Sequence, residues 1–143
     1  MKLKEIMSNS VVRINPEESV AVAARTLSRH NIGALPVCDA NEKLCGVVTD
    51  RDLVTRCIAA GRNPEATKVR DVMTANVVSA RPDLDTVAAA QLMARQQIRR
   101  LPIVERGHLC GMVSLGDLAN REETSYDAAD ALMGISSNVS VRE

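Results

Sequence analysis

Two segments of the chain place a hydroxyl side chain three residues before a carboxylate. Thr49 precedes Asp52 in the first segment, and Ser114 precedes Asp117 in the second. In both, a glycine and two apolar residues come before the hydroxyl residue, a pattern typical of a strand that runs into a helix. At such a junction the hydroxyl and the free N–H groups of the first helical turn can hold an anion such as phosphate. The carboxylate can accept hydrogen bonds from vicinal hydroxyls, such as those of a ribose. The pattern therefore predicts two candidate sites for a phosphate and a ribose.

The same residue types have a simpler interpretation as helix caps. Thr49 and Ser114 are good N-cap residues, and Asp50, Asp52 and Asp117 would stabilise the positive end of a helix dipole. One junction by itself would favour this interpretation. The pattern occurs twice, which strengthens ligand binding as a hypothesis, and capping remains the alternative.

The two junctions belong to an internal repeat. Shifting the sequence by 66 positions places Leu35-Pro36 on Leu101-Pro102, together with many other identical residues. After a one-residue deletion in a turn the offset becomes 65, and Asp52 then meets Asp117. A repeat of this length predicts two copies of one structural unit.

Each copy is expected to fold as a βαββα unit. In the first copy, residues 11–14 predict a strand, and Ser19 is the expected N-cap of the helix that follows. One face of that helix should be buried, with apolar residues at helical spacing: Val20, Ala23, Ala24 and Leu27. Residues 34–38 and 44–48 predict a β-hairpin. A second helix is expected to begin at residue 49 or 50 and to end at Gly61. Its apolar face should hold Leu53, Val54, Cys57 and Ile58.

The predicted organisation is a first unit over residues 1–61, a linker over 62–68, a second unit over 69–120 and a tail over 121–143 with a short helix at 125–136. The turn at 105–108 in the second unit contains the glycine expected of a tight hairpin. Each unit alone is too small to bury its apolar faces well. We therefore expect an α+β fold in which two pseudo-twofold-related units pack sheet to sheet, and the tail helix packs on this body or on a partner chain.

Composition restricts the classes of function. Eighteen basic residues balance 18 acidic ones, so no overall field would attract nucleic acid or an anionic membrane. No stretch has the length of a membrane span, and the first residues do not resemble a signal peptide, so a cytoplasmic location is expected. With Tyr126 as the sole aromatic residue, the core must be aliphatic. The four cysteines form no CxxC pair, and we expect them to pack as small apolar residues.

These motifs together resemble a pair of cystathionine β-synthase (CBS) domains, the tandem often called a Bateman module. The resemblance covers residues 1 to about 120, and it is closest to short stand-alone bacterial proteins. Matching pairs of segments occur in register in both copies: residues 4–7 and 70–73, 35–37 and 101–103, and 46–52 and 111–117. The resemblance implies that Thr49, Asp52, Ser114 and Asp117 contact the phosphate and ribose of an adenosine ligand such as AMP, ADP or ATP in the cleft between the two units.

The resemblance also implies a role for arginines. In CBS pairs that bind nucleotides, a basic residue at the position of Arg99 or Arg100 reaches the phosphates, and arginine–phosphate pairing is strong. The corresponding residues in the first copy are Gly33 and Ala34, which carry no charge. We therefore expect unequal affinity at the two sites, with Arg51 close to the same phosphates. The alternative is that these arginines lie in a solvated turn.

The adenine base is expected in an apolar slot, again by resemblance. The residues implied are Val12 and Val78 on the first strands, with Ile32 and Ile98 nearby. Core packing is their expected main role.

The function predicted from these observations is that of a regulatory sensor of adenine nucleotides, not an enzyme. His30 and His108 have no catalytic partner, and no phosphate-binding glycine loop is present. No cofactor or metal is expected, and the nucleotide acts as a ligand. The expected partners are a second copy of the chain and a target protein of unknown identity. A ligand-free dimerisation or interaction module is the alternative, and a thiol- or metal-dependent stress sensor is a weaker one.

Overall fold

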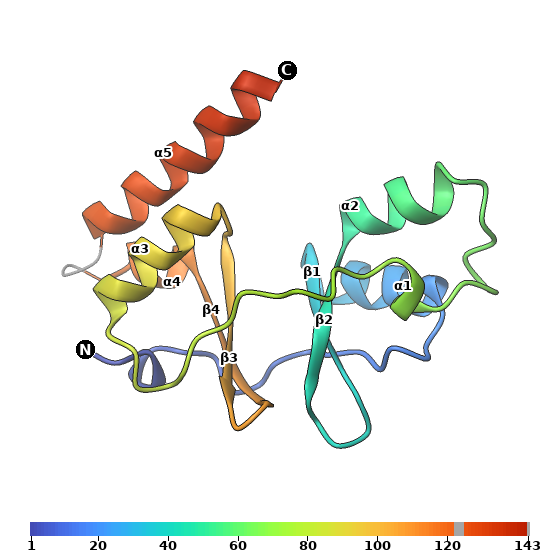
Figure 1. The fold of residues 1–143 in the computed structure, drawn as a ribbon, viewed down its shortest axis with the longest axis horizontal. Helices are drawn as coiled ribbons and strands as arrows, with labels where there is room; N and C mark the ends of the chain where they lie inside the picture. The colour runs from blue at the N-terminus through green and yellow to red at the C-terminus, as the bar shows by residue number, and fades with distance from the viewer. Residues whose placement is uncertain (122–124, 143) are drawn as a thin grey trace. The chain divides into compact units, whose positions relative to one another are not determined.

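The computed structural model describes residues 1–121 and 125–142, with side chains up to residue 135. Contacts divide the chain into two compact units (Figure 1). We call Val12–Val77 the first-repeat unit, and Met1–Val11 together with Val78–Glu143 the second-repeat unit. Each unit thus contains the segment that precedes the other repeat. The units in space differ in this way from the sequence units 1–61 and 69–120.

In each unit, a glycine makes room for the segment that precedes the other repeat. The N–H of Ser8 donates to the carbonyl of Met112 at 2.9 Å, and that of Thr74 donates to the carbonyl of Val47 at 2.9 Å. A Cβ on Gly46 would lie 2.5 Å from the carbonyl oxygen of Thr74. A Cβ on Gly111 would lie 2.5 Å from the sulfur of Met7. Glycine is therefore needed at both positions, because the segment that precedes the other repeat crosses the hairpin there.

The first-repeat unit is built around one hairpin. Its elements are α1 (Val20–His30), β1 (Ala34–Cys38), β2 (Leu44–Thr49), α2 (Asp50–Asp52), the π-helical turn η2 (Leu53–Ile58) and the 3₁₀ turn η3 (Val69–Asp71). Strands β1 and β2 pair antiparallel, with Ala34 opposite Thr49. The Ser19 hydroxyl caps α1 by accepting from the N–H of Val22 at 3.2 Å. The predicted hairpin, helix and cap are confirmed.

The second-repeat unit has the same plan with an added helix. Its elements are η1 (Leu3–Glu5), α3 (Thr86–Gln96), β3 (Arg100–Glu105), β4 (His108–Ser114), α4 (Leu115–Ala119) and α5 (Ser125–Arg142). Strands β3 and β4 form a second antiparallel pair. Arg106 and Gly107 both have positive φ, 52° and 82°, as a type I′ hairpin turn requires. The two small sheets with flanking helices confirm the α+β class.

The expected strand at residues 11–14 is wrong. Only Ile14 makes a bridge there, and it pairs in parallel with Val37. Asn15-Pro16 follows at once, and proline supplies no N–H to continue a ladder. The equivalent residue of the second repeat, Ala80, makes the same kind of bridge with Ile103.

The tail helix is longer than predicted. Helix α5 continues through Gly134 and ends at Arg142 instead of residue 136. One face of it, formed by Ala128, Ala131 and Ile135, is buried in the core of the second-repeat unit. Tertiary packing therefore offsets the cost of the glycine within the helix.

The apolar face of the second helix is split between core and surface. Leu53 is 6 % exposed and Cys57 fully buried, as predicted, whereas Val54 and Ile58 are each 57 % exposed. Residues four apart share one stripe of a helix, so only the stripe with Leu53 and Cys57 faces the core. Ala24 of α1, also predicted to be buried, is exposed as well.

Each unit has its own aliphatic core. Leu35, Val37 and Val48 are fully buried in the first-repeat unit. Leu101, Ile103 and Val113 take the corresponding places in the second. Val48 and Val113 lie on β2 and β4, whose last residues are the hydroxyl residues Thr49 and Ser114 of the candidate site.

Candidate functional site

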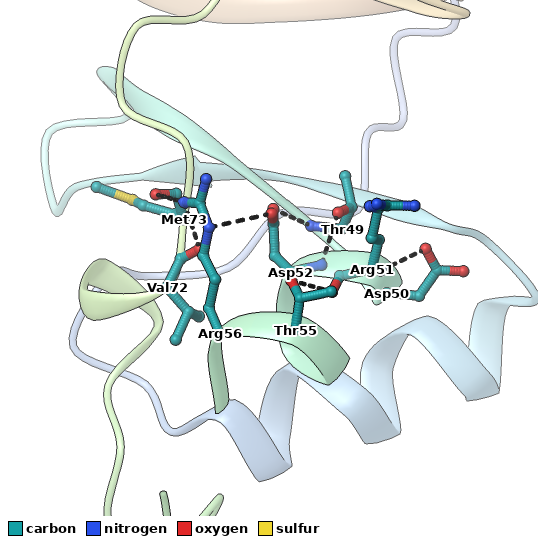
Figure 2. A network of polar contacts seen from close by, with 8 residues as sticks. All are labelled: Thr49, Asp50, Arg51, Asp52, Thr55, Arg56, Val72 and Met73. Atoms are coloured by element: carbon teal, nitrogen blue, oxygen red, sulfur yellow. Dashed lines mark hydrogen bonds and ion pairs between the residues drawn. The ribbon is translucent and has the colours of Figure 1, made fainter. Parts of the chain in front are cut away.

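The first corner is the junction of β2 and α2, where Thr49 and Asp52 cap the helix reciprocally (Figure 2). The N–H of Asp52 donates to the hydroxyl oxygen of Thr49 at 3.0 Å. The N–H of Thr49 donates to Oδ2 of Asp52 at 3.0 Å. This arrangement is a capping box, in which each side chain satisfies the other residue's backbone.

The second corner, at the junction of β4 and α4, repeats this geometry. The N–H of Asp117 donates to Oγ of Ser114 at 3.1 Å, and the N–H of Ser114 donates to Oδ2 of Asp117 at 2.8 Å. Asp117 is half-buried, whereas Asp52 is 9 % exposed. The capping alternative therefore describes one part of both motifs. In each corner, Oδ2 of the aspartate takes part in the capping box, and Oδ1 does not.

An arginine that sequence reasoning missed stands beside the first corner. Nε of Arg56 lies 3.8 Å from Oδ1 of Asp52. Its Nη1 donates to the carbonyl oxygens of Val72 at 3.2 Å and Met73 at 3.1 Å (Figure 2). Arg56 thus joins the capped helix to the segment that precedes the second repeat. The spacing of four residues between Asp52 and Arg56 was the signal that could have revealed the pair.

The residues on the neighbouring strand give the two corners different charges. In the second-repeat unit, Arg100 lies opposite Ser114 in the strand pair. The N–H of Leu115 donates to the carbonyl of Arg99 at 3.0 Å, so the backbone of Arg99 adjoins the same corner. Both arginine side chains are exposed. The second corner therefore combines two exposed cationic residues with one capping carboxylate.

In the first-repeat unit, an acidic residue adjoins the equivalent positions. The N–H of Asp50 donates to the carbonyl of Gly33 at 3.0 Å. A Cβ placed on Gly33 would lie 3.5 Å from Oδ2 of Asp50. Gly33 corresponds to Arg99 of the second repeat. The carboxylate of Asp50 therefore lies next to the position that corresponds to the Cβ of Arg99. Arg51 is exposed, and its N–H donates to Oδ1 of Asp50 at 2.8 Å.

The structure thus brings Arg99 and Arg100 to the Ser114–Asp117 corner, and Arg51 to the Thr49–Asp52 corner. These two groups belong to different units. That all three arginines meet the same phosphates stays a prediction.

The four residues predicted to surround the base are half-buried. Val12 and Ile32 pack at the margin of the first-repeat core. Val78 and Ile98 pack at the margin of the second-repeat core. Their packing role is therefore present, and contact with a base stays a prediction.

The cysteines are all free thiols. Burial raises the pKa of Cys38 to about 11, and it also raises the pKa of Cys110, so both thiols are protonated at neutral pH. Among the described residues, no three His, Cys, Asp or Glu side chains come together in a way that could hold a metal ion. Within the same residues, no helix has both the length and the apolar character needed to cross a membrane.

Comparison with known proteins identifies the class. The CBS domain family matches residues 3–58 and again 69–123, so the chain belongs to this family and contains a tandem CBS pair, a regulatory type of domain. The CBS domain-containing protein YhcV of Bacillus subtilis is 41% identical over 134 residues, which are 94% of each chain.

Two solved structures are similar to this chain. The structure of Hypoxic Response Protein I with two coordinated zinc ions matches with a TM-score of 0.78 and 28% identity, covering 85% of this chain and 98% of that one. The CBS domain pair of protein MJ0100, in complex with 5-methylthioadenosine and S-adenosyl-L-methionine, matches with a TM-score of 0.74 and 27% identity. It covers 84% of this chain and 94% of that one.

Proposed function

We propose that this protein is a non-catalytic regulatory module, located in the cytoplasm, that binds an adenine nucleotide of the AMP, ADP or ATP class and acts as a homodimer on a target protein. The observation that carries the proposal is the second corner, where Arg99 and Arg100 adjoin Ser114 and Asp117. Two guanidinium groups match a phosphate chain, and Oδ1 of Asp117 lies outside the capping box and can accept from a ribose hydroxyl. The adenosine ligands of the MJ0100 pair support the same ligand class.

A second candidate function is a ligand-free interaction module. The observation that favours it is that both capping boxes are complete without a ligand. A helix cap alone accounts for the residue types at positions 49, 52, 114 and 117. Only a binding measurement separates the two candidates.

The experiment is thermal unfolding of the full chain with AMP, ADP, ATP or S-adenosylmethionine. A ligand that binds only the folded state raises Tm, by on the order of 10 °C at a hundredfold excess over Kd for a chain of this length. A shift with at least one adenine nucleotide is the expected result. No shift with any of the four ligands would remove nucleotide sensing and leave the interaction module.

Two variants assign the corners. Asp52→Asn and Asp117→Asn keep an oxygen that can accept the capping hydrogen bond, and they remove the carboxylate charge and its second acceptor. Asp83→Asn, at an exposed carboxylate outside both corners, is the matched control. We expect Asp117→Asn to reduce the ATP-induced shift more than Asp52→Asn does. Equal shifts in all three variants and the wild type would show that the nucleotide binds elsewhere.

A further inference from the structure

The two repeats differ in what covers their helices. In the second-repeat unit, α5 packs along α3 and α4. Its buried side chains, Ala128, Ala131 and Ile135, join Ala90, Met93 and Leu118 in one cluster. Ala90, Met93 and Leu118 are all fully buried there. The helical face of this repeat is therefore completed by α5.

The equivalent face of the first-repeat unit is open. The positions that correspond to Ala90, Met93 and Leu118 are Ala24, Leu27 and Leu53. They border a groove of about 460 Å³, which is also lined by Val20, Val54 and Ile58. We call it the α1–η2 groove. Leu27 and Leu53 are each 6 % exposed, whereas Ala24 is exposed and Val54 and Ile58 are each 57 % exposed. Apolar side chains in such a position are typical of an interaction surface.

Helix α5 has a second apolar face that its own unit does not bury. Tyr126 is 86 % exposed, Met133 67 % and Leu132 43 %. Together with Val54 and Ile58, these residues make up all the large exposed apolar side chains in the described part of the chain except Met1. The chain therefore carries an apolar groove and an apolar helix face, and a helix of the same kind fills the equivalent groove in the other repeat.

Charged side chains border both surfaces. Helix α1, which forms one wall of the groove, carries Arg25 and Arg29 and no acidic residue. Arg25, however, pairs with Glu65 at 3.7 Å, and Asp50 lines the groove itself. The described side chains of α5 include Asp127 and Asp130 and no lysine or arginine. The fit between the two surfaces therefore rests on apolar burial and not on opposite charge.

We propose that the outward face of α5 docks into the α1–η2 groove of a second copy of this chain. The inference rests on the self-association in the proposed function and does not require nucleotide binding. Each copy supplies both a groove and a helix, so the pairing joins two different surfaces of the same sequence.

Sedimentation of the full chain over a range of concentrations tests the proposal with one variant in each surface. Ile58→Glu places a charge in the groove, and Met133→Glu places one on α5; both positions are exposed, so the monomer should fold. Each variant is expected to raise the dimer Kd by roughly tenfold or more, because apolar burial is lost and a charge must be desolvated. Gln91→Glu, an exposed position on α3, adds the same charge outside both surfaces and should leave Kd unchanged. Far-UV circular dichroism confirms that each variant is folded.

Mixing the two variants tests which surface meets which. The Met133→Glu chain keeps an intact groove and the Ile58→Glu chain keeps an intact α5, so the mixture should recover association that neither variant shows alone. The fluorescence of Tyr126, the sole aromatic residue, should change in step with association because it lies on the docking face.

The possible negative results of these experiments lead to different conclusions. A wild-type chain that stays monomeric at the highest concentration would overturn both self-association and this interface. A wild-type dimer that neither substitution weakens would overturn the interface and leave self-association standing. Weakening by both variants without recovery in the mixture would show that the groove of one chain does not meet α5 of the other, which would also overturn the proposal.

Discussion

The two strand-to-helix corners share a backbone and differ in charge. Thr49–Asp52 and Ser114–Asp117 form capping boxes with hydrogen bonds between 2.8 and 3.1 Å. Asp50, Arg51 and the ion-paired Arg56 adjoin the first box, whereas Arg99 and Arg100 adjoin the second. The repeat therefore keeps the framework of the corner, while the adjoining positions give the two corners different charged side chains.

The largest expected effect concerns the arginines of the second corner. The double substitution Arg99→Gln with Arg100→Gln should weaken ATP binding by on the order of tenfold to a hundredfold, because charge-assisted hydrogen bonds to phosphate are lost. Calorimetric titration measures the change. The affinity for adenosine, which has no phosphate, should change little.

Two controls sharpen this prediction. Arg95→Gln removes an exposed arginine of α3 away from the corner and should leave ATP affinity unchanged. Asp50→Leu combined with Ala34→Arg removes the acidic residue of the first corner and adds one of the two arginines of the second, and we expect it to bind ATP more tightly there. An equal loss of ATP and adenosine affinity in the double variant would mean that the arginines do not act on phosphate.

A smaller effect is expected from the shared capping boxes. Thr49→Ala and Ser114→Ala each remove the side-chain oxygen that accepts from the third helical residue, and each should lower the free energy of unfolding by about 1 kcal/mol. Urea denaturation measures the loss. Similar losses at both corners would show that the framework is equivalent and that the difference between corners is one of charge.

Thr49→Ser is the control for this pair. It keeps the hydroxyl that the repeat places at the second corner and should be nearly neutral. A loss confined to one of the two alanine variants would contradict the equivalence of the boxes.

Much of the fold follows from local sequence signals. Both hairpins, α1 with its Ser19 cap and the type I′ turn at Gly107 were predictable, because each depends on residues close in sequence. That each unit contains the segment preceding the other repeat was not predictable, because this arrangement depends on long-range packing. Gly46 and Gly111 mark it only once the crossing segments are known.

The site was predictable to a similar degree. The recurrence of Thr49–Asp52 and Ser114–Asp117 predicted two matching corners, and the structure places Arg99 and Arg100 beside the second. Sequence spacing could not show that Arg56 reaches the carbonyls of Val72 and Met73, which lie 16 and 17 residues further along the chain. Nor could it separate the buried stripe of the second helix from the exposed one, since both are apolar.

The smallest expected effect concerns Arg56, which distinguishes the first corner further. Arg56→Gln removes the hydrogen bonds to Val72 and Met73 and the ion pair with Asp52 (Figure 2). Because the Arg56 side chain is 51% exposed, solvent screens the ion pair, and the free energy of unfolding should fall by only about 0.5 kcal/mol.

Hydrogen exchange gives the more specific measurement for Arg56. Amides of residues 69–74 should exchange faster in Arg56→Gln, because their segment loses its attachment to the capped helix. The equivalent segment, residues 3–8, lies in the other unit and provides an internal control that should not change. Arg121→Gln, at the equivalent repeat position, should leave both segments as in the wild type. Unchanged exchange at residues 69–74 in Arg56→Gln would mean that the first corner is not coupled to the segment preceding the second repeat. The two corners would then differ only in the charge that they present to a ligand.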